Sequence, residues 1–247
     1  MNPAEWEARV DLAALYRLVD LYGWSDLAGT HISHRVPGEP DHFLINPFGF
    51  LWDEITASML LKVDYDGNLL NASNQKPNPA GTTIHSAILM TRPDVNCAIH
   101  THTAAGTGVA TQKDGLLPLT QHALHVIAHS GYYDYGGIET DPSERDRIAA
   151  AVGEHKVLFL RNHGLIAMGR TPGEAFMWMY RTERACRMQL AVQQAGAPYV
   201  ELPEQVVAET IERNRFLNSE AGYRPIGVNE WPALRRKLDR LDPSYKS

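Results

Sequence analysis

The chain has 247 residues, of which 44% are hydrophobic, and its formal net charge is −6. This length supports one large domain with a substantial core, or at most two small domains. The mildly acidic balance argues against nucleic acid or an anionic membrane as a partner. Two cysteines are too few for a disulfide framework. Because no apolar stretch is long enough to span a bilayer and the N-terminus lacks a signal-peptide core, we expect a cytoplasmic protein.

The N-terminal half is predicted to begin with a helix and to continue mainly as short strands. Apolar residues at helical spacing indicate a helix from Ala4 to Tyr22 that ends at Gly23. Asp66-Gly67 is a strong hairpin-turn signal between two apolar runs. The other elements expected here are strands over Thr30–Val36, His42–Ile45, Leu61–Tyr65 and Asn68–Leu70, a polar loop over Asn71–Pro79, a helix over Thr82–Thr91 and a buried strand over Val95–Thr101.

The C-terminal half is predicted to be mostly helical. Asp141 is the expected N-cap of a helix that has Pro142 at its first position and ends near Gly153. The remaining elements are a buried strand over Lys156–Arg161, a strand over Leu165–Met168 that pairs with it or extends it, and helices over Thr171–Gln194, Glu204–Asn218 and Trp231–Leu241. Because strands and helices are mixed along the chain without a repeat or boundary, we predict a single α/β domain over residues 1–247.

Three histidines are candidate metal ligands. His100 and His102 lie at the end of a predicted strand, where side chains two residues apart point to the same side. His163 follows the second buried strand, and Gly164 would free the backbone to turn sharply there. If the two strand ends are neighbours, the three imidazoles converge and leave a coordination position open, as catalytic sites do. Because no cluster of hard oxygen ligands is evident, a transition metal suits this set better than calcium or magnesium. Zinc is the first choice, with iron, manganese or cobalt as alternatives.

The histidine pattern also has a plainer interpretation. In a chain with 11 histidines a His-x-His pair arises easily by chance, and both rings could be satisfied by backbone partners. His31 and His34 are an odd number of residues apart, so on a strand they face opposite sides. His122 and His125 have helical spacing, with surface or core positions as the alternative. Three other histidines give no indication of a site: His42, His85 and His155.

Five segments occur in a specific order along the chain. They are Ile45–Gly49, Glu54–Ser58, Ala80–Ile88, Arg92–Thr103 and Leu160–Leu165. This series resembles the class II aldolase/adducin family, and the similarity runs from about Leu12 to Ala191. The resemblance implies a class II aldolase-like, three-layer α/β/α fold with a mixed central sheet. Its core would cover about residues 12–191, followed by a helical extension over 204–241.

The resemblance also implies a set of site residues. The metal ligands of the family are the two histidines of the His-x-His pair and the histidine before Gly-Leu, which correspond to His100, His102 and His163. The family's aldolases are typically fourfold tetramers with active sites at subunit interfaces, so we expect a homotetramer. The positions that correspond to substrate contacts are His31, Ser33, Asn46, Gly49 and Gly81.

Two departures from the family pattern concern its chemistry. The family's aldolases and epimerases carry Ser-Ser-Glu, with the Glu as general acid/base, where this chain has Pro79-Ala80-Gly81. Their early phosphate-binding loop is replaced by Thr30-His31-Ile32-Ser33. These changes point away from a sugar-phosphate substrate.

A histidine is the expected replacement for a catalytic group of the family. Some family aldolases use a tyrosine of the neighbouring subunit as proton donor, and His122 falls near that position. A histidine titrates near neutrality, so His122 is the candidate catalytic acid or base. Further donor candidates are Tyr132, Tyr133 and Tyr135, with core packing as the alternative.

These features predict a metal-dependent lyase-type enzyme. The reaction would be aldolase-like carbon–carbon cleavage or decarboxylation of a small, non-phosphorylated carbonyl or carboxylate substrate. Two alternatives stay open: an iron-dependent oxygenase on the same scaffold, and a non-catalytic, adducin-like oligomeric scaffold. The histidine triad favours an enzyme, because a scaffold has no chemical need for it, whereas the absent Glu favours a scaffold.

Overall fold

The structure is a computed structural model that describes residues 1–137, 142–219, 221–222 and 225–247. A seven-stranded mixed sheet lies at its centre, in the order β3-β2-β1-β4-β7-β6-β5. Its strands are β1 (His31–Val36), β2 (Glu39–Ile45), β3 (Leu61–Asp64), β4 (Cys97–Thr101), β5 (Ser130–Tyr133), β6 (Val157–Leu160) and β7 (Gly164–Gly169). Neighbouring strands are antiparallel except β5 and β6, which are parallel.

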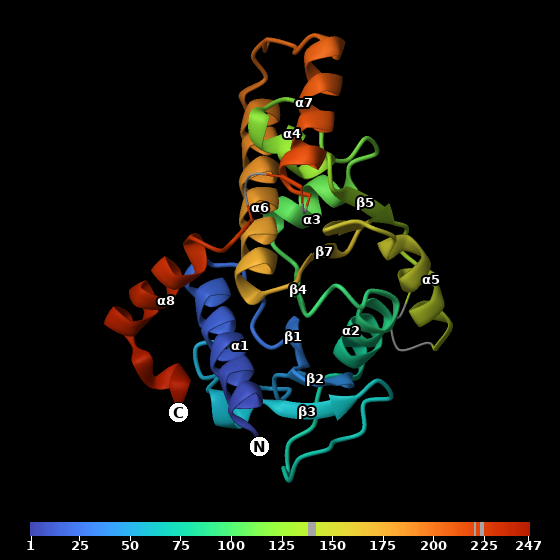
Figure 1. The fold of residues 1–247 in the computed structure, drawn as a ribbon. Coiled ribbons are helices and arrows are strands. Elements are labelled where there is room, and N and C mark those ends of the chain that lie inside the picture. Colours follow the sequence, from blue (N-terminus) through green and yellow to red (C-terminus); the bar gives the residue numbers. More distant parts are fainter. Residues whose placement is uncertain (138–141, 220, 223–224) are drawn as a thin grey trace.

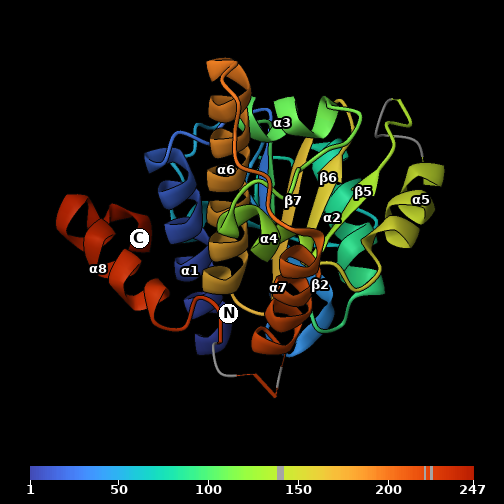
Figure 2. The ribbon, with the colours of Figure 1, turned by 90° about the horizontal axis from the view of Figure 1, so that it is seen from above.

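Helices cover both faces of the sheet (Figures 1 and 2). They are α1 (Pro3–Leu21), α2 (Pro79–Thr91), α3 (Ala104–Thr111), α4 (Gln121–Ile127), α5 (Pro142–Val152), α6 (Pro172–Ala195), α7 (Glu204–Leu217) and α8 (Glu230–Leu241). One apolar core joins the sheet to α1, α3, α4 and α6, and a second core joins its other face to α2 and α5. The expected single-domain, three-layer α/β/α architecture with a mixed sheet is therefore confirmed.

Local capping explains where three helices begin. Asn2, Asn78 and Thr171 each precede a proline at the first helical position, and each side chain accepts a hydrogen bond from the first turn. Because Asn78 caps α2, this helix begins at Pro79 and not at Thr82 as predicted. The long helix α6 ends at Gly196, which has a φ of 60° that favours glycine.

Several predicted elements differ from the structure. The segment Asn68–Leu70 does not form a strand; it contributes one isolated bridge, between Leu69 and Val63. The helices α3 and α4 and the strand β5 were not predicted as elements. Asp141, the expected N-cap of α5, lies outside the described residues.

The edge strand β3 is only four residues long, and its outer side is covered by the chain that follows it. Besides the bridge from Val63 to Leu69, the Leu70 amide donates to the Lys62 carbonyl at 2.8 Å. The Lys62 amide in turn donates to the side chain of Asn71 at 2.8 Å. The backbone groups of this edge are therefore occupied within the chain.

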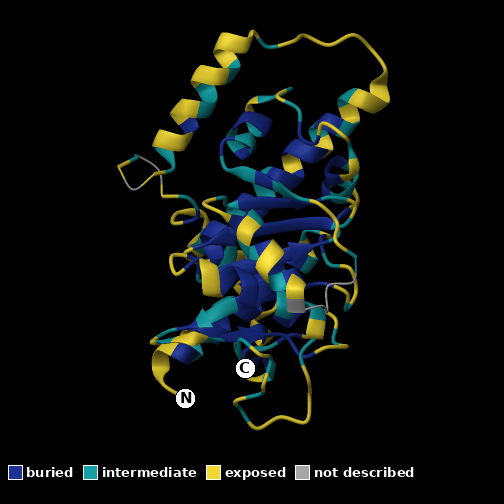
Figure 3. Cartoon of the chain, turned by 90° about the vertical axis from the view of Figure 1, so that its right-hand side faces the viewer, coloured by how far each residue is buried: buried dark blue, intermediate teal, exposed yellow. Residues whose placement is uncertain are grey.

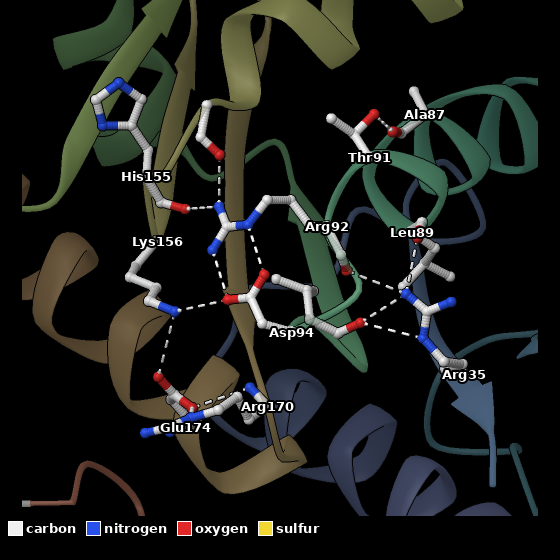
Figure 4. Close-up of polar contacts among 12 residues, drawn as sticks. Arg35, Ala87, Leu89, Thr91, Arg92, Asp94, His155, Lys156, Arg170 and Glu174 are labelled. Atoms are coloured by element: carbon white, nitrogen blue, oxygen red, sulfur yellow. Dashed lines mark hydrogen bonds and ion pairs between the residues drawn. The ribbon is translucent and has the colours of Figure 1, made fainter. Parts of the chain in front are cut away.

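A polar clamp fastens the α2–β4 turn to the α5–β6 turn (Figure 4). The Arg92 guanidinium donates to both carboxylate oxygens of Asp94, at 2.7 and 2.8 Å. It also donates to the carbonyls of Gly153 at 2.7 Å and His155 at 2.9 Å. From β1, Arg35 donates to the carbonyls of Leu89, Arg92 and Val95. The clamp thus holds β4 and β6, the two strands that lead to the candidate ligands.

The C-terminal part is more exposed than the core. Figure 3 shows buried residues concentrated in the sheet, while α7 presents mostly exposed residues to solvent. The helix α7 packs on α4, and α8 packs on α1 and α6. Among the described helices, none has the length and apolar character needed to cross a membrane.

Candidate metal centre

The topology of the sheet brings the three candidate ligands together. Strands β4 and β7 are antiparallel neighbours, so the end of β4 lies beside the start of β7. His100 is on β4, His102 follows its last residue, and His163 directly precedes β7. The Nε2 atom of His102 lies 2.9 Å from Nε2 of His100 and 2.9 Å from Nε2 of His163. The predicted convergence of these imidazoles is therefore present in the structure.

The turn that carries His163 depends on two residues in different ways. The positive φ occurs at Asn162, at 58°, and not at Gly164 as we expected. Asparagine tolerates this left-handed conformation better than most residues. Gly164 is needed for space instead, because a Cβ there would lie 2.4 Å from the Thr101 carbonyl oxygen and 3.0 Å from the His102 ring. The absence of a side chain at 164 lets β7 lie against the end of β4.

Contacts on the far side of two rings orient them. His100 Nδ1 lies 3.0 Å from the Leu165 carbonyl oxygen, and His102 Nδ1 lies 3.0 Å from the Asp26 carboxylate. Both partners only accept, so each Nδ1 carries the proton in the neutral ring, and each Nε2 presents a lone pair. Such outer contacts are the usual means of orienting histidine ligands.

The donor set fits a divalent transition metal. With both Nδ1 atoms protonated, the Nε2 lone pairs of His100 and His102 lie 2.9 Å apart, and a cation bound by both would relieve their repulsion. Burial and the adjoining histidines hold the pKa of His100 well below its ordinary value, so the ring is neutral as a ligand must be. The three ligand atoms lie within 4.8 Å of one another, and three ligands leave room for a fourth.

The residues expected to bind substrate divide into two groups. His31 and Ser33, on β1, and Gly81, on α2, lie together on the face of the sheet that also carries His100. Asn46 is buried at the end of β2 and accepts a hydrogen bond from the Tyr16 hydroxyl at 2.8 Å. Gly49 lies in an exposed turn with a φ of 94°. No described contact joins Asn46 or Gly49 to the triad, so their role in substrate binding stays a prediction.

The candidate proton donors lie apart from one another. His122 is on α4, where it lines a cavity of about 220 Å³ with Met177, Tyr180 and Arg181. Partial burial and two nearby arginines lower its pKa. Among the described residues no contact joins it to the triad, so its role as catalytic acid or base stays a prediction. Tyr135 is exposed and lies near the triad, with its ring centre 6.3 Å from that of His163.

The other two tyrosines serve the packing of the fold. The Tyr132 hydroxyl accepts a hydrogen bond from the Leu116 amide at 2.9 Å, and its ring lies under the Arg161 guanidinium. The Tyr133 hydroxyl donates to the buried Glu144 carboxylate. Core packing therefore accounts for both.

Two residues of the site were not predicted from the sequence. His85 is buried on α2 and contacts both His31 and Ser33. A signal for it was available, because His85 is four residues after Gly81 and so shares its helix face. Asp26 lies in the loop before β1, 76 residues from His102 in sequence. No sequence motif links Asp26 to His102.

Comparison with known proteins identifies the family. Residues 10–190 match the profile described as "Class II Aldolase and Adducin N-terminal domain". The chain belongs to the class II aldolase/adducin family. The expected resemblance is confirmed, and membership associates the chain with aldolase-like, metal-dependent lyase chemistry at a coarse level.

Relatives with different names share this domain. A protein of Caulobacter vibrioides named "Putative aldolase class 2 protein" is 46% identical over 99% of this chain and 94% of its own length. Alpha-adducin of Rattus norvegicus is 42% identical over 94% of this chain but only 33% of its own length. The chain thus corresponds to about a third of an adducin.

Solved structures confirm the fold. An aldolase II superfamily protein from Pseudomonas syringae superimposes with a TM-score of 0.93 at 44% identity, covering 100% of this chain and 98% of that one. An L-fuculose 1-phosphate aldolase from Glaciozyma antarctica superimposes with a TM-score of 0.82 at 26% identity, covering 98% and 93%.

Proposed function

We propose that the protein is a metal-dependent lyase that cleaves a carbon–carbon bond in a small carbonyl or carboxylate compound, by an aldolase-like or decarboxylation reaction. The observation that carries this proposal is the convergence of His100, His102 and His163 on one point. Three imidazoles with a fourth position open are typical of catalytic metal sites, whereas structural sites are closed. Zinc is the first choice of ion, with iron, manganese or cobalt as alternatives.

The chain's own residues would hold and orient the reacting groups. A bound divalent ion supplies a Lewis acid that stabilises negative charge developing on a substrate oxygen. The Leu165 carbonyl and the Asp26 carboxylate hold the rings of His100 and His102 so that their Nε2 atoms face the point where a metal would be held. Tyr135 and a neighbouring subunit's copy of His122 are the candidate groups that move a proton.

The residues around the triad support a substrate without a phosphate group. The hydroxyl of Ser33 is fully buried and is engaged by His85 at 2.5 Å. Ala80 and Gly81 have no side-chain donor. The positions expected to contact substrate therefore offer few donors for a phosphate, although His31 remains available to a smaller polar group.

The assembly we propose is a homotetramer that takes up a small-molecule substrate. An oligomer follows from the proposed role of His122, because no described contact joins His122 to the triad of its own chain and it would have to serve the triad of another copy. The domain would be one catalytic unit over residues 1–247, with the helices after residue 203 as an extension. The location proposed for it is the cytoplasm.

The second candidate function is a non-catalytic oligomeric scaffold. It is favoured by the similarity to alpha-adducin and by the absence of a carboxylate at position 81. The triad with its oriented lone pairs favours the enzyme, because a scaffold has no use for an open metal site.

Metal content tests the proposal directly. We expect the purified protein to contain one zinc, iron, manganese or cobalt ion per chain by elemental mass spectrometry, and His163→Ala to lose at least nine tenths of it. The matched control is His34→Ala, which should retain the metal because His34 lies on β1 with its Nδ1 on the Arg35 carbonyl. Iron would direct the substrate search to oxygenase chemistry. A protein without metal, even after reconstitution, would refute the enzyme and leave the scaffold.

A further inference from the structure

A buried chain of hydrogen bonds runs from β1 through α2 and back to β1. The Ser33 hydroxyl lies 2.5 Å from Nδ1 of His85, and Nε2 of His85 lies 2.8 Å from Nδ1 of His31. Ser33 and His85 have no exposed surface and His31 is 2% exposed. Both ring nitrogens of His85 are therefore hydrogen-bonded inside the protein, and the series of hydrogen bonds ends at His31.

His31, the last residue of this hydrogen-bond series, lies beside the candidate metal centre. His31 pairs with His100 across β1 and β4, and their ring centres are 5.0 Å apart. Within the described part of the chain, no hydrogen bond uses Nε2 of His31. This nitrogen is thus left for a group that enters the site from outside.

The His31 ring fits against α2 only because position 81 is a glycine. A Cβ at Gly81 would lie 2.8 Å from Cδ2 of His31 and 2.9 Å from its Cγ. Any side chain at 81 would therefore compete with the His31 ring for one space. The glycine at position 81 on α2 therefore makes room for the imidazole of His31 on β1.

The protons of Ser33, His85 and His31 can be arranged in two ways along these hydrogen bonds. Both rings are buried without a charged partner among the described residues, and burial disfavours the charged form, so each ring is neutral and carries one N–H. In one arrangement Ser33 donates to His85, His85 donates to Nδ1 of His31, and Nε2 of His31 carries a proton. In the reverse arrangement Nε2 of His31 is an acceptor.

We propose that His85 is a positioning residue that holds His31 as the tautomer with a proton on Nε2, so that His31 donates a hydrogen bond to an oxygen of the small-molecule ligand at the metal centre. This inference rests on the proposed metal site, because the metal determines which small molecules bind beside His31. Ligands of a Lewis-acid centre carry oxygen atoms with partial or full negative charge, which accept hydrogen bonds. A neutral donor at His31 also avoids placing a second cation next to the ion.

The test uses zinc-loaded protein and acetohydroxamate, a small chelating acid with two adjacent oxygens. His85→Leu removes the donor to His31, whereas the side-chain amide of His85→Gln retains an N–H to donate. We expect His85→Leu to bind acetohydroxamate about tenfold more weakly than wild type, and His85→Gln to recover a large part of the affinity. The matched control, His34→Leu on the same strand, should bind as wild type does.

Zinc content, measured on every sample, separates this inference from the proposed function. Unchanged affinity in zinc-replete His85→Leu would overturn the role of His85, as would loss of zinc from that variant alone. A wild-type protein that holds no zinc would instead overturn the metal centre itself.

A second measurement needs no variant at position 85. Nitrogen-15 NMR of zinc-loaded protein labelled at histidine, with His31 assigned through His31→Gln, reports which nitrogen carries the proton. We expect the proton on Nε2, and a proton on Nδ1 would overturn the inference even if His85→Leu does not fold.

Discussion

His102 has contacts on both ring nitrogens: Nε2 faces the other two candidate ligands, and Nδ1 faces Asp26. The Asp26 side chain is 55% exposed, so the pair adds little stability as a surface ion pair. Its value lies in fixing the ring, because outer carboxylates determine the tautomer and the direction of histidine ligands.

We therefore expect Asp26→Ala to weaken metal binding about 10- to 100-fold with little effect on unfolding. Competition with a chromophoric chelator measures this affinity. The exposed Asp41→Ala on β2 is the control and should bind metal as wild type does. Equal affinities in the two variants would show that Asp26 does not orient the ligand.

At the residue scale, the sequence indicated the three candidate ligands and part of their surroundings, but it missed His85 and Asp26. The spacing of His100 and His102 on a strand, with the family motif around His163, was sufficient to predict that the three imidazoles converge. His85 was missed although it follows Gly81 by one helical turn, because that spacing does not reveal its partners on β1. Its contacts with Ser33 and His31 exist only once α2 packs on β1.

At the element scale, long periodic segments were predictable and short ones were not. The helices α1 and α6 have apolar periodicity over many residues and strong caps. By contrast, α3 contains two glycines and two threonines in eight residues, and β5 is four residues long. These elements form because of tertiary packing: Gly106 leaves space for the Leu165 side chain, and β5 pairs with β6.

The clamp between elements gives a pH-dependent contribution to stability. The Arg92 guanidinium, with help from Lys156, lowers the pKa of Asp94 from 3.8 to about 2. A carboxyl whose folded pKa is lowered stabilises the fold above its unfolded pKa, and this stabilisation is lost as pH falls through about 2. Because the Asp94 side chain is 46% exposed, we expect a contribution of only about 1 kcal/mol.

Asp94→Asn tests this contribution. At pH 7 the variant should be about 1 kcal/mol less stable than wild type in urea unfolding, since the charged contact is lost. The difference should shrink progressively below pH 4 as the wild-type carboxyl becomes protonated. A difference that stays constant down to pH 2 would show that charge is not its origin.

At the scale of the whole molecule, the site is assembled from distant parts of the chain. Strands β4 and β7, the loop before β1 and the helix α2 each contribute a residue to the ligands or their surroundings. An ion held at this point would link the end of β4 to the start of β7 and would bind only the folded chain. Metal binding should therefore stabilise the whole domain.

We expect removal of the metal to lower the melting temperature by roughly 5–10 °C, because an ion at 100 times its dissociation constant contributes about 2.7 kcal/mol. Differential scanning calorimetry before and after dialysis against dipicolinate measures this shift. His163→Ala, treated in the same way, should show no change. An equal shift in both proteins would mean that the chelator acts elsewhere.

The covered edge of β3 has a consequence for behaviour at high concentration. An open sheet edge offers free amide and carbonyl groups to which another chain can add a strand, which is a common route to aggregation. Here Leu69, Leu70 and Asn71 already occupy those groups, and Lys62 places a charge on the same short strand. Growth of the sheet from one molecule into the next is blocked at this edge, so copies of the chain would associate there through side chains and not by shared backbone pairing.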